Sequence, residues 1–408
     1  MKTVKLGIIG LGERGRNLLD DVIMFMDDVE ILAVCDAYED RALAGAEAVR
    51  AGKSGAVLCT TDYRDILKME EINAIAILSA WESHVPIALA AMRAGKAVAM
   101  EVGGAYSPED CWALVRTQEE TGAVCMMLEN CCYGRTELMV TNMVRKGLFG
   151  EVVHCAGGYH HDLREQIAFG AENRHYRLRN YLNRNCDNYP THELGPIAKL
   201  LDINNGNRML TLSSFASKAA GMQAYLAEKK PEDTALNRTA FMQGDVVTTV
   251  IKCARGETIV LTLDTTLPRT YSRGFRVRGT KAAYEDENKS FFFDGEHHEF
   301  DFKWQEQWGN ADKYREEHEH PLWTAYNKEG VKNGHGGIDY LVLRAFFECV
   351  QNGTEPPIDV YDTAAWMSVT ALSEDSIAQG GAPLAMPDFT GGRWLCKKPP
   401  MDTRYNLR

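Results

Sequence analysis

Short apolar runs alternate with longer mixed segments over the first 130 residues of the chain. Such runs are typical of strands that helices cover on both faces, and they occupy residues 4–9, 29–35, 72–78, 97–100 and 123–128. The segments between them have helical length and mixed polarity, and they occupy residues 13–26, 39–51, 83–94 and 108–121. This alternation predicts a doubly wound parallel sheet, the Rossmann type of α/β fold.

The pattern changes after residue 150. Longer alternating runs at 151–159, 209–217, 245–253, 258–265 and 275–278 predict an open, mainly antiparallel sheet. Helical patterns at 194–203, 338–351 and 362–379 are expected to cover one of its faces. Segment 285–333 has no period that predicts an element. We therefore expect a cofactor domain at 1–130 and an α+β substrate domain at 131–408.

Composition excludes several classes of protein. The 45 Lys and Arg against 57 Asp and Glu give a net charge of −12, so nucleic acid is not expected as a partner. No apolar run is long enough for a membrane helix. The 11 Cys lack zinc-type spacing, so we expect reduced thiols and no metal. Because the first residues run straight into a strand, we expect no signal peptide and a cytoplasmic protein.

A glycine-rich turn follows the first predicted strand. Gly10, Gly12 and Gly15 form GxGxxG, which gives a tight turn, lets the backbone approach a pyrophosphate and packs the helix on the strand. Asp36 ends the second strand, where a carboxylate accepts hydrogen bonds from the adenine ribose. This pattern favours NAD over NADP; FAD, or a turn that binds nothing, is the alternative.

Candidate catalytic residues gather at three places. Glu129 and Asn130 follow the last parallel strand, where ligands of such sheets bind. Residues 159–164 (YHHDLR) close a strand of the second domain, and residues 188–192 (NYPTH) precede a helical pattern. Histidine is the usual proton acceptor near pH 7. Each residue alone is as compatible with a packed structural role, and Asp162 with Arg164 is as compatible with an ion pair that orients the loop.

Several long motifs resemble a known family. The chain resembles the Gfo/Idh/MocA oxidoreductase superfamily and, within it, the NAD-dependent α-N-acetylgalactosaminidases, which are glycoside hydrolases. The matching stretches are WESHVP at 81–86, ENCCY at 129–133, GLFGEVVHCAGGYHHDLR at 147–164, NYPTHELGP at 188–196, GDVVTTVIK at 244–252, DTTLPRTYSRG at 264–274, GHGGIDY at 334–340, VYDTAAWMSVTALSEDSI at 360–377 and PDFTGGRW at 387–394.

The resemblance implies specific site residues. Catalytic roles are implied for Glu129, Tyr159, Tyr189 and His192, and substrate contacts for Tyr159, His161, Arg164, Tyr189, His192 and Tyr271. Cofactor contacts are implied for Gly10, Gly12, Glu13, Arg14, Gly15, Asp36, Trp81, His84, Glu101 and Asn130. The lysine of the superfamily's dehydrogenases is missing at 101–103, which fits the glycosidase branch. Ser83 and Glu193 differ from the family pattern and are expected to alter the sugar pocket.

The family resemblance also implies a mechanism and partners. Bound NAD oxidises carbon 3 of the sugar, carbon 2 loses a proton, the aglycone leaves carbon 1, water adds, and carbon 3 is reduced again. His192 is expected to act on the carbon 3 hydroxyl. Tyr159 is expected to act on carbon 2, with positive charge or hydrogen bonds supplied by His161 and Arg164. A homo-oligomer is implied as well. The alternatives are an NAD-dependent sugar or polyol dehydrogenase and, from another class, an NAD-dependent regulatory binder.

Overall fold

The chain forms two compact units in the computed structural model, which describes residues 2–53, 55–298 and 303–407. The first unit comprises Met1–Asn130, Tyr326–Met367 and Pro399–Arg408, and the second comprises Cys131–Ala325 and Ser368–Lys398. The sequence analysis assigned all of 131–408 to one domain. Two C-terminal segments instead belong to the first unit.

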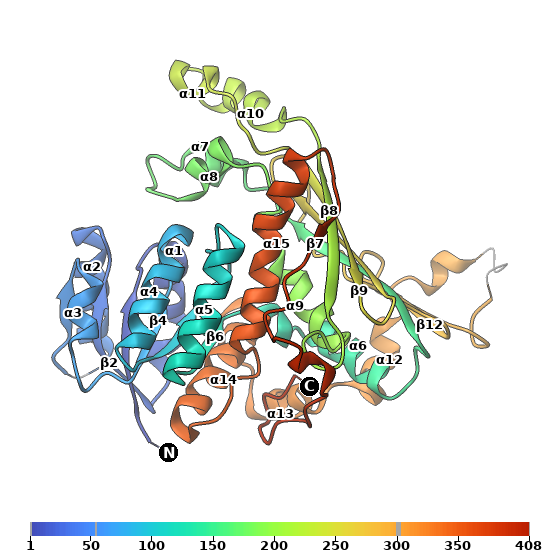
Figure 1. Ribbon diagram of the computed structural model, residues 1–408, viewed down its shortest axis with the longest axis horizontal. Coiled ribbons are helices and arrows are strands. Elements are labelled where there is room, and N and C mark those ends of the chain that lie inside the picture. The colour runs from blue at the N-terminus through green and yellow to red at the C-terminus, as the bar shows by residue number, and fades with distance from the viewer. Residues whose placement is uncertain (1, 54, 299–302, 408) are drawn as a thin grey trace. The chain divides into compact units, whose positions relative to one another are not determined.

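A six-stranded sheet forms the centre of the first unit (Figure 1). Its strands are β1 (Val4–Ile9), β2 (Val29–Cys35), β3 (Leu58–Thr60), β4 (Ala74–Ile77), β5 (Ala97–Met100) and β6 (Cys125–Met127). Every neighbouring pair is parallel, in the order β3-β2-β1-β4-β5-β6. The doubly wound parallel sheet is therefore confirmed. β3 was not predicted, because it is only three residues long and none of them is buried.

The helices of the first unit are α1 (Glu13–Asp21), α2 (Glu39–Gly52), α3 (Tyr63–Leu67), α4 (Trp81–Arg93), α5 (Pro108–Thr121) and α14 (Ile338–Asn352). The four helices predicted for the first 130 residues are present, together with α3, which was not predicted, and α14, which was assigned to the second domain. Ser107 and Asp110 form a capping box at the start of α5, and Gly122 ends that helix with φ 66°. α1 is shorter than predicted, since the chain turns into a 3-10 helix at Ile23–Phe25.

Polar contacts explain why α14 belongs to the first unit. Arg344 on α14 donates two hydrogen bonds to Asp28 at 2.7 and 2.9 Å, and Gln351 donates a third at 2.7 Å. α14 also packs against β1. The apolar positions in the sequence predict this helix but do not show which sheet it covers. For this reason the boundaries of the two units differ from the predicted division at residue 130.

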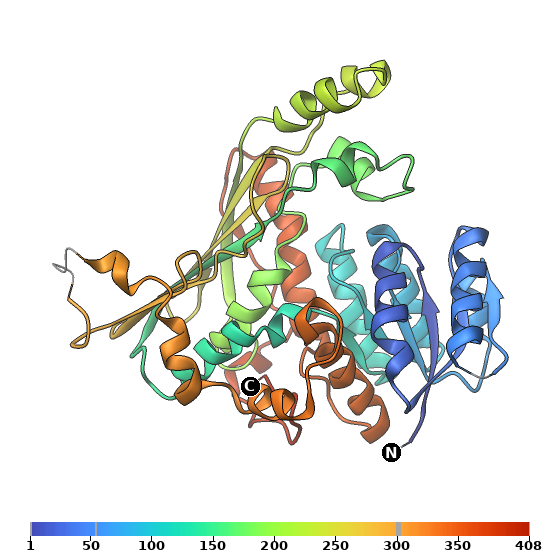
Figure 2. The same ribbon diagram turned by 180° about the vertical axis from the view of Figure 1, so that it is seen from behind.

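An eight-stranded sheet organises the second unit (Figure 2). Its order is β13-β12-β11-β7-β10-β9-β8-β14. The strands are β7 (Val152–His160), β8 (Met209–Ala216), β9 (Val246–Cys253), β10 (Thr258–Asp264), β11 (Arg276–Gly279), β12 (Ala282–Glu285), β13 (Ser290–Phe293) and β14 (Leu384–Ala385). Only the β7–β10 pair is parallel, which confirms the mainly antiparallel sheet.

One face of this second sheet is covered. In β10 alternate residues are buried, namely Ile259, Leu261 and Leu263. The helices are α6 (Arg135–Arg145), α7 (Arg164–Ala168), α8 (Arg177–Asn183), α9 (Thr191–Leu200), α10 (Gly221–Lys229), α11 (Thr234–Arg238) and α12 (Ala311–His318). α13 (Pro321–Glu329) and α15 (Val360–Ala378) each contribute residues to both units. α9 packs on β7, and Ser376 of α15 accepts a hydrogen bond from Ser214 of β8.

Two chain-wide features bear on the earlier expectations. All eleven cysteines are free thiols. Within residues 2–53, 55–298 and 303–407, no helix has the length and apolar character that crossing a membrane requires.

Candidate functional site

The glycine turn has the geometry that a dinucleotide requires. Gly10 has φ +101°, and a Cβ there would lie 2.4 Å from the backbone N of Ser79. A Cβ on Gly15 would lie 2.1 Å from the carbonyl oxygen of Gly10, so only glycine lets α1 pack this closely. Gly12 is less crowded, because a Cβ there would have Nη1 of Arg41 as its nearest neighbour, at 3.5 Å. The start of α1 thus offers accessible backbone to a pyrophosphate.

Asp36 is held beside this turn by two backbone amides. Leu11 donates to Oδ2 at 2.7 Å, and Tyr38 donates to Oδ1 at 2.9 Å. The carboxylate is 6% exposed. Each carboxylate oxygen has more than one acceptor site, so ribose hydroxyls can bind while both amide bonds persist. The residues present therefore fit the adenosine half of NAD.

Arg14, in the first turn of α1, is fixed by two carboxylates. Its Nε donates to Glu101 at 2.8 Å, and its two terminal nitrogens donate to Asp339 at 2.8 Å each. Asn130 donates to the same Asp339 at 2.7 Å. Hydrogen bonds from Arg14 and His335 outweigh burial and hold the pKa of Asp339 well below its usual range. Asp339 thus joins Arg14 to Asn130, and Arg14 in turn binds Glu101, so three residues of the predicted cofactor set belong to one network.

Asp339 and His335 were not singled out from the sequence. His335 lies 2.6 Å from Asp339, through Nδ1 and Oδ2. Both residues belong to the GHGGIDY motif, in which Gly334 and Gly337 have φ +91° and +98°. A cluster of glycines beside His and Asp was the signal that could have pointed to them. The motif does not indicate that Asp339 binds Arg14, which lies more than 300 residues earlier in the chain.

Trp81 and His84 pack at the start of α4 against two glycines. A Cβ on Gly103 would lie 2.7 Å from Nε1 of Trp81, and a Cβ on Gly104 would lie 2.6 Å from Cβ of His84. Both ring nitrogens of His84 lie near backbone carbonyl oxygens, Nε2 at 2.9 Å from that of Ser79 and Nδ1 at 3.2 Å from that of Gly103, and burial lowers the pKa of the ring. Glu13 is exposed in the first turn of α1. All ten predicted cofactor residues therefore belong to the first unit.

The second unit brings the predicted phenols and imidazoles together. The ring of Tyr159 lies 4.3 Å from that of Tyr189 and 5.4 Å from that of His192, centroid to centroid. The rings of Tyr189 and His192 are 4.7 Å apart. Tyr271 completes the cluster, with its centroid 5.1 Å from His161 and 6.4 Å from Tyr159. Residues from β7, the start of α9 and the β10–β11 connection thus form one group, the aromatic cluster.

A hydrogen bond links two members of the aromatic cluster. Oη of Tyr159 lies 2.9 Å from Nδ1 of His161. Burial raises the pKa of Tyr159 to about 12, although the nearby charge of Arg177 acts in the opposite direction. Burial and Arg177 both lower the pKa of His161. At neutral pH the pair is therefore a phenol and a neutral imidazole, and the imidazole can accept the phenol's proton.

The sequence analysis named His161 and Arg164 as suppliers of charge or hydrogen bonds to Tyr159; His161 supplies the hydrogen bond, whereas the nearby positive charge is that of Arg177. Arg164 forms an ion pair with Asp162 at 2.7 Å and lies 5.0 Å over the ring of Tyr225. Arg177 on α8, which is 6% exposed, lies 5.2 Å over the ring of Tyr189. The sequence analysis missed Arg177, because it lies between the two recognised motifs, and only folding brings α8 to the aromatic cluster.

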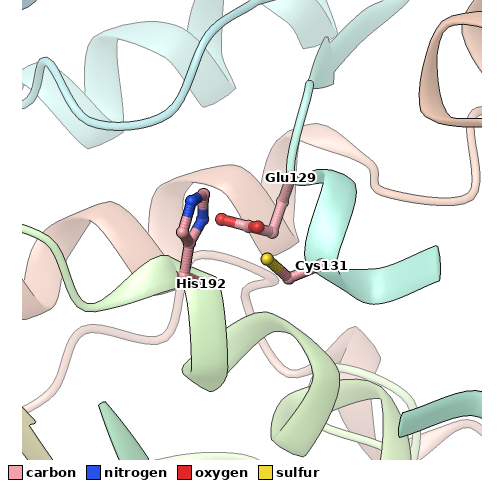
Figure 3. A group of neighbouring side chains, drawn as sticks. All are labelled: Glu129, Cys131 and His192. Carbon is pink, nitrogen blue, oxygen red and sulfur yellow. The ribbon is translucent and has the colours of Figure 1, made fainter. Parts of the chain in front are cut away.

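His192 also has a thiol neighbour. Figure 3 draws His192 at the start of α9 with Cys131 and Glu129. The Sγ of Cys131 and a ring nitrogen of His192 lie within 4.8 Å of each other. Cys131 is 3% exposed. Glu129 is completely buried and follows β6, two residues before Cys131 in the chain.

The two positions that differ from the family pattern have separate environments. Glu193 is fully buried, with its carboxylate 3.9 Å from Nε of Arg273. Gly157 makes room for it, since a Cβ there would lie 2.0 Å from Cγ of Glu193. Arg273 also pairs with Glu137.

Ser83 lies on α4, where its hydroxyl donates to the carbonyl of Ala80 at 2.7 Å.

Comparisons with solved structures agree with this fold. Levoglucosan dehydrogenase in complex with NADH and levoglucosan has a TM-score of 0.67 at 18% identity, covering 95% of this chain and 100% of that one. Myo-inositol 2-dehydrogenase from Lactobacillus plantarum has a TM-score of 0.65 at 15% identity, with coverage of 95% and 100%. At these identities the likeness establishes the fold alone.

Comparisons of sequence establish the family. A glycosyl hydrolase family 109 protein from Solibacter usitatus is 39% identical over 405 residues, which cover 97% of this chain and 90% of that protein. An alpha-N-acetylgalactosaminidase from Tannerella forsythia is 38% identical over 321 residues, with coverage of 74% and 67%. Residues 4–129 match the oxidoreductase family with an NAD-binding Rossmann fold, and residues 133–396 match the glycosyl hydrolase 109 C-terminal domain. The chain therefore belongs to the glycosyl hydrolase 109 family, a glycosidase branch of the Gfo/Idh/MocA superfamily.

Proposed function

We propose that this glycosidase uses bound NAD to hydrolyse α-N-acetylgalactosaminides or related glycosides. The observation that carries the proposal is the aromatic cluster, in which Tyr159, Tyr189 and His192 lie within 5.4 Å of one another, centroid to centroid. Proton acceptors other than paired carboxylates suit a route through elimination, because direct displacement at carbon 1 usually needs two carboxyl groups.

The fit of the first unit to NAD supports the cofactor. Gly10, Gly12 and Gly15 would hold the pyrophosphate, and Asp36 would accept hydrogen bonds from the ribose. The Arg14 network would position the remaining contacts. When bound, NAD supplies a hydride acceptor for carbon 3 of the sugar and returns the hydride at the end of turnover. No metal is part of this proposal.

We assign the first proton transfer to His192. It takes the proton of the carbon 3 hydroxyl as that carbon is oxidised, and Tyr189, whose ring is 4.7 Å away, orients the imidazole. Tyr271, 55% exposed, and Arg164 are assigned to sugar binding. Glu129 is assigned to a sugar hydroxyl or to the leaving group.

The second proton transfer is assigned to Tyr159 together with His161. A ketone at carbon 3 acidifies the hydrogen on carbon 2, and Tyr159 accepts that proton while its own phenolic proton passes to Nδ1 of His161 over 2.9 Å. This relay avoids a buried phenolate, which the raised pKa of Tyr159 disfavours. The aglycone then leaves carbon 1, and water adds to the unsaturated ketone.

Two further expectations stay predictions. A homo-oligomer is supported by side chains exposed on the uncovered face of the second sheet, such as Phe215 and Val250. Sedimentation analysis of the purified protein tests this oligomeric state.

The cytoplasmic location also stays a prediction, and fractionation of cells tests it.

A panel of nitrophenyl glycosides tests the function. Nitrophenol release and NADH absorbance are followed together on purified protein, with the His192→Ala variant as the inactive control. The proposal expects nitrophenol release with the N-acetylgalactosaminide and no net NADH. Stoichiometric accumulation of NADH would instead establish a dehydrogenase.

Hydrolysis in deuterium oxide tests the chemistry. Removal and return of the carbon 2 proton should place deuterium at carbon 2 of the released sugar. A sugar without deuterium there, together with no isotope effect from a substrate deuterated at carbon 2, would exclude the elimination route.

A further inference from the structure

Asp187 is a buried carboxyl group next to the turn that carries Tyr189 and His192. It is 1% exposed. Thr249 of β9 donates to its Oδ2 at 3.3 Å, and the backbone N–H of Tyr189 donates to its carboxyl group. Its own backbone N–H donates to Oγ of Ser373 on α15 at 2.8 Å. One residue thus connects the turn to the sheet and to α15.

The groups around Asp187 leave its carboxyl group without a cation. Within the described part of the chain, Asp187 takes part in no ion pair. Cys186 precedes it as a buried thiol, and the nearby Arg184 and Glu374 are paired with each other. Thr249 and Ser373 contribute only hydroxyls, and Thr249 accepts a further bond from Ser214 at 2.9 Å. Burial raises the pKa of Asp187 to about 7 against these hydrogen bonds.

We propose that Asp187 is a positioning residue whose neutral carboxyl group holds the turn of Tyr189 and His192 in place, and whose ionisation releases that turn. A buried carboxylate without a cation must gain water or move toward it. The turn is the element that Asp187 ties down, so the turn moves with it. Tyr189 and His192 then lose their alignment within the aromatic cluster.

The catalytic consequence rests on the proposed function, so the test includes two measurements that need no activity. The Asp187→Asn variant keeps the shape and an accepting oxygen but cannot ionise. Asp245→Asn is the matched control, because Asp245 is another buried carboxyl group of the second unit and accepts bonds from Gly221 and Thr266 at 3.0 and 2.7 Å.

The first measurement is the infrared carbonyl band of a protonated carboxylic acid in the full-length protein. We expect a band that the wild type and Asp245→Asn share, that Asp187→Asn lacks, and that titrates with a midpoint of about pH 7. The second measurement is the NMR signal of ¹³C-labelled Tyr189, assigned with Tyr189→Phe. It should shift with the same midpoint in the wild type and stay constant in Asp187→Asn.

The third measurement is kcat against pH. The wild-type value should fall as pH rises through this range, whereas Asp187→Asn should not fall. Asp187→Ala should lose about tenfold in kcat, since one or two hydrogen bonds disappear. A carboxyl group already ionised at pH 5 would overturn the proposal, as would a Tyr189 signal or a kcat profile that Asp187→Asn leaves unchanged. If no glycoside is hydrolysed, the proposed function fails, while the infrared and NMR results still decide the role of Asp187.

Discussion

The phenolic oxygen of Tyr159, near the end of β7, and Nδ1 of His161, directly after that strand, are joined by a 2.9 Å hydrogen bond. The two residues are two positions apart in the chain, and their ring centroids lie 5.5 Å apart. Because burial raises one pKa and lowers the other, the pair holds a proton on the phenol and leaves the imidazole ready to accept it.

Replacing Tyr159 by Phe should remove the elimination step. The ring and its packing remain, but the oxygen that exchanges protons with His161 is lost, so glycoside turnover should fall by about 10²- to 10⁴-fold. Nitrophenol release and deuterium at carbon 2 are the readouts. Tyr284→Phe is the matched control, because Tyr284 is another buried tyrosine of the second sheet, on β12. Retention of near-normal turnover in Tyr159→Phe would exclude this residue from the chemistry.

The rate should depend on the neutral form of His161. Burial lowers its pKa, and the imidazole accepts a proton only above that pKa. We therefore expect kcat to be lost as pH falls through the lowered pKa of His161 and to recover as pH rises toward neutrality. His161→Gln should lower kcat and abolish this acid limb. His154→Gln, a change on the same strand, should keep it. A rate that still climbs tenfold per pH unit above pH 9 would indicate a phenolate base instead.

Asp36→Ala should weaken NAD binding by about ten- to a hundredfold, the effect of losing hydrogen bonds to a charged acceptor. The change removes the carboxylate that the amides of Leu11 and Tyr38 hold beside the turn. Calorimetric titration with NAD measures the effect. Asp62→Ala is the control, since Asp62 caps α3 in the same unit. Equal NAD affinities in the wild type and in Asp36→Ala would reduce Asp36 to a structural role.

Asp339→Asn should weaken both the first unit and its affinity for NAD. Arg14 loses a charged partner bound through two hydrogen bonds, which costs about 2 kcal/mol of unfolding free energy. Since the folded-state pKa of Asp339 is depressed, its stabilisation is present above the ordinary aspartate pKa and is lost as pH falls below it. The difference in unfolding free energy between the wild type and Asp339→Asn should therefore become smaller at acidic pH.

Denaturant unfolding and NAD titration check the role of Asp339. Asp20→Asn, which breaks the more exposed pair with Arg16, should change the unfolding free energy by less than about 1 kcal/mol. If Asp339→Asn behaved like Asp20→Asn in both measurements, the Arg14 network would have no part in cofactor binding.

The sequence by itself determined the local structure and the cofactor turn. β1, β2, β5 and α5 begin and end where the pattern predicts, because buried parallel strands are short apolar runs and capping residues are local signals. The proximity of Asp36 to the turn of Gly10, Gly12 and Gly15 could be predicted for the same reason. Their function depends on a strand, a turn and a helix that follow each other directly in the chain.

Only the tertiary structure decided which distant groups meet. Hydrophobic periodicity predicts that a helix has a buried face but not what that face covers, so α14 with Asp339 joins the first unit rather than the second. Electrostatics depends on distance and burial, which the sequence does not contain. That is why Arg177, and not Arg164, is the cation that acts on Tyr159. It is also why Asp187, one more acidic residue in the printed sequence, has a raised pKa in the folded protein.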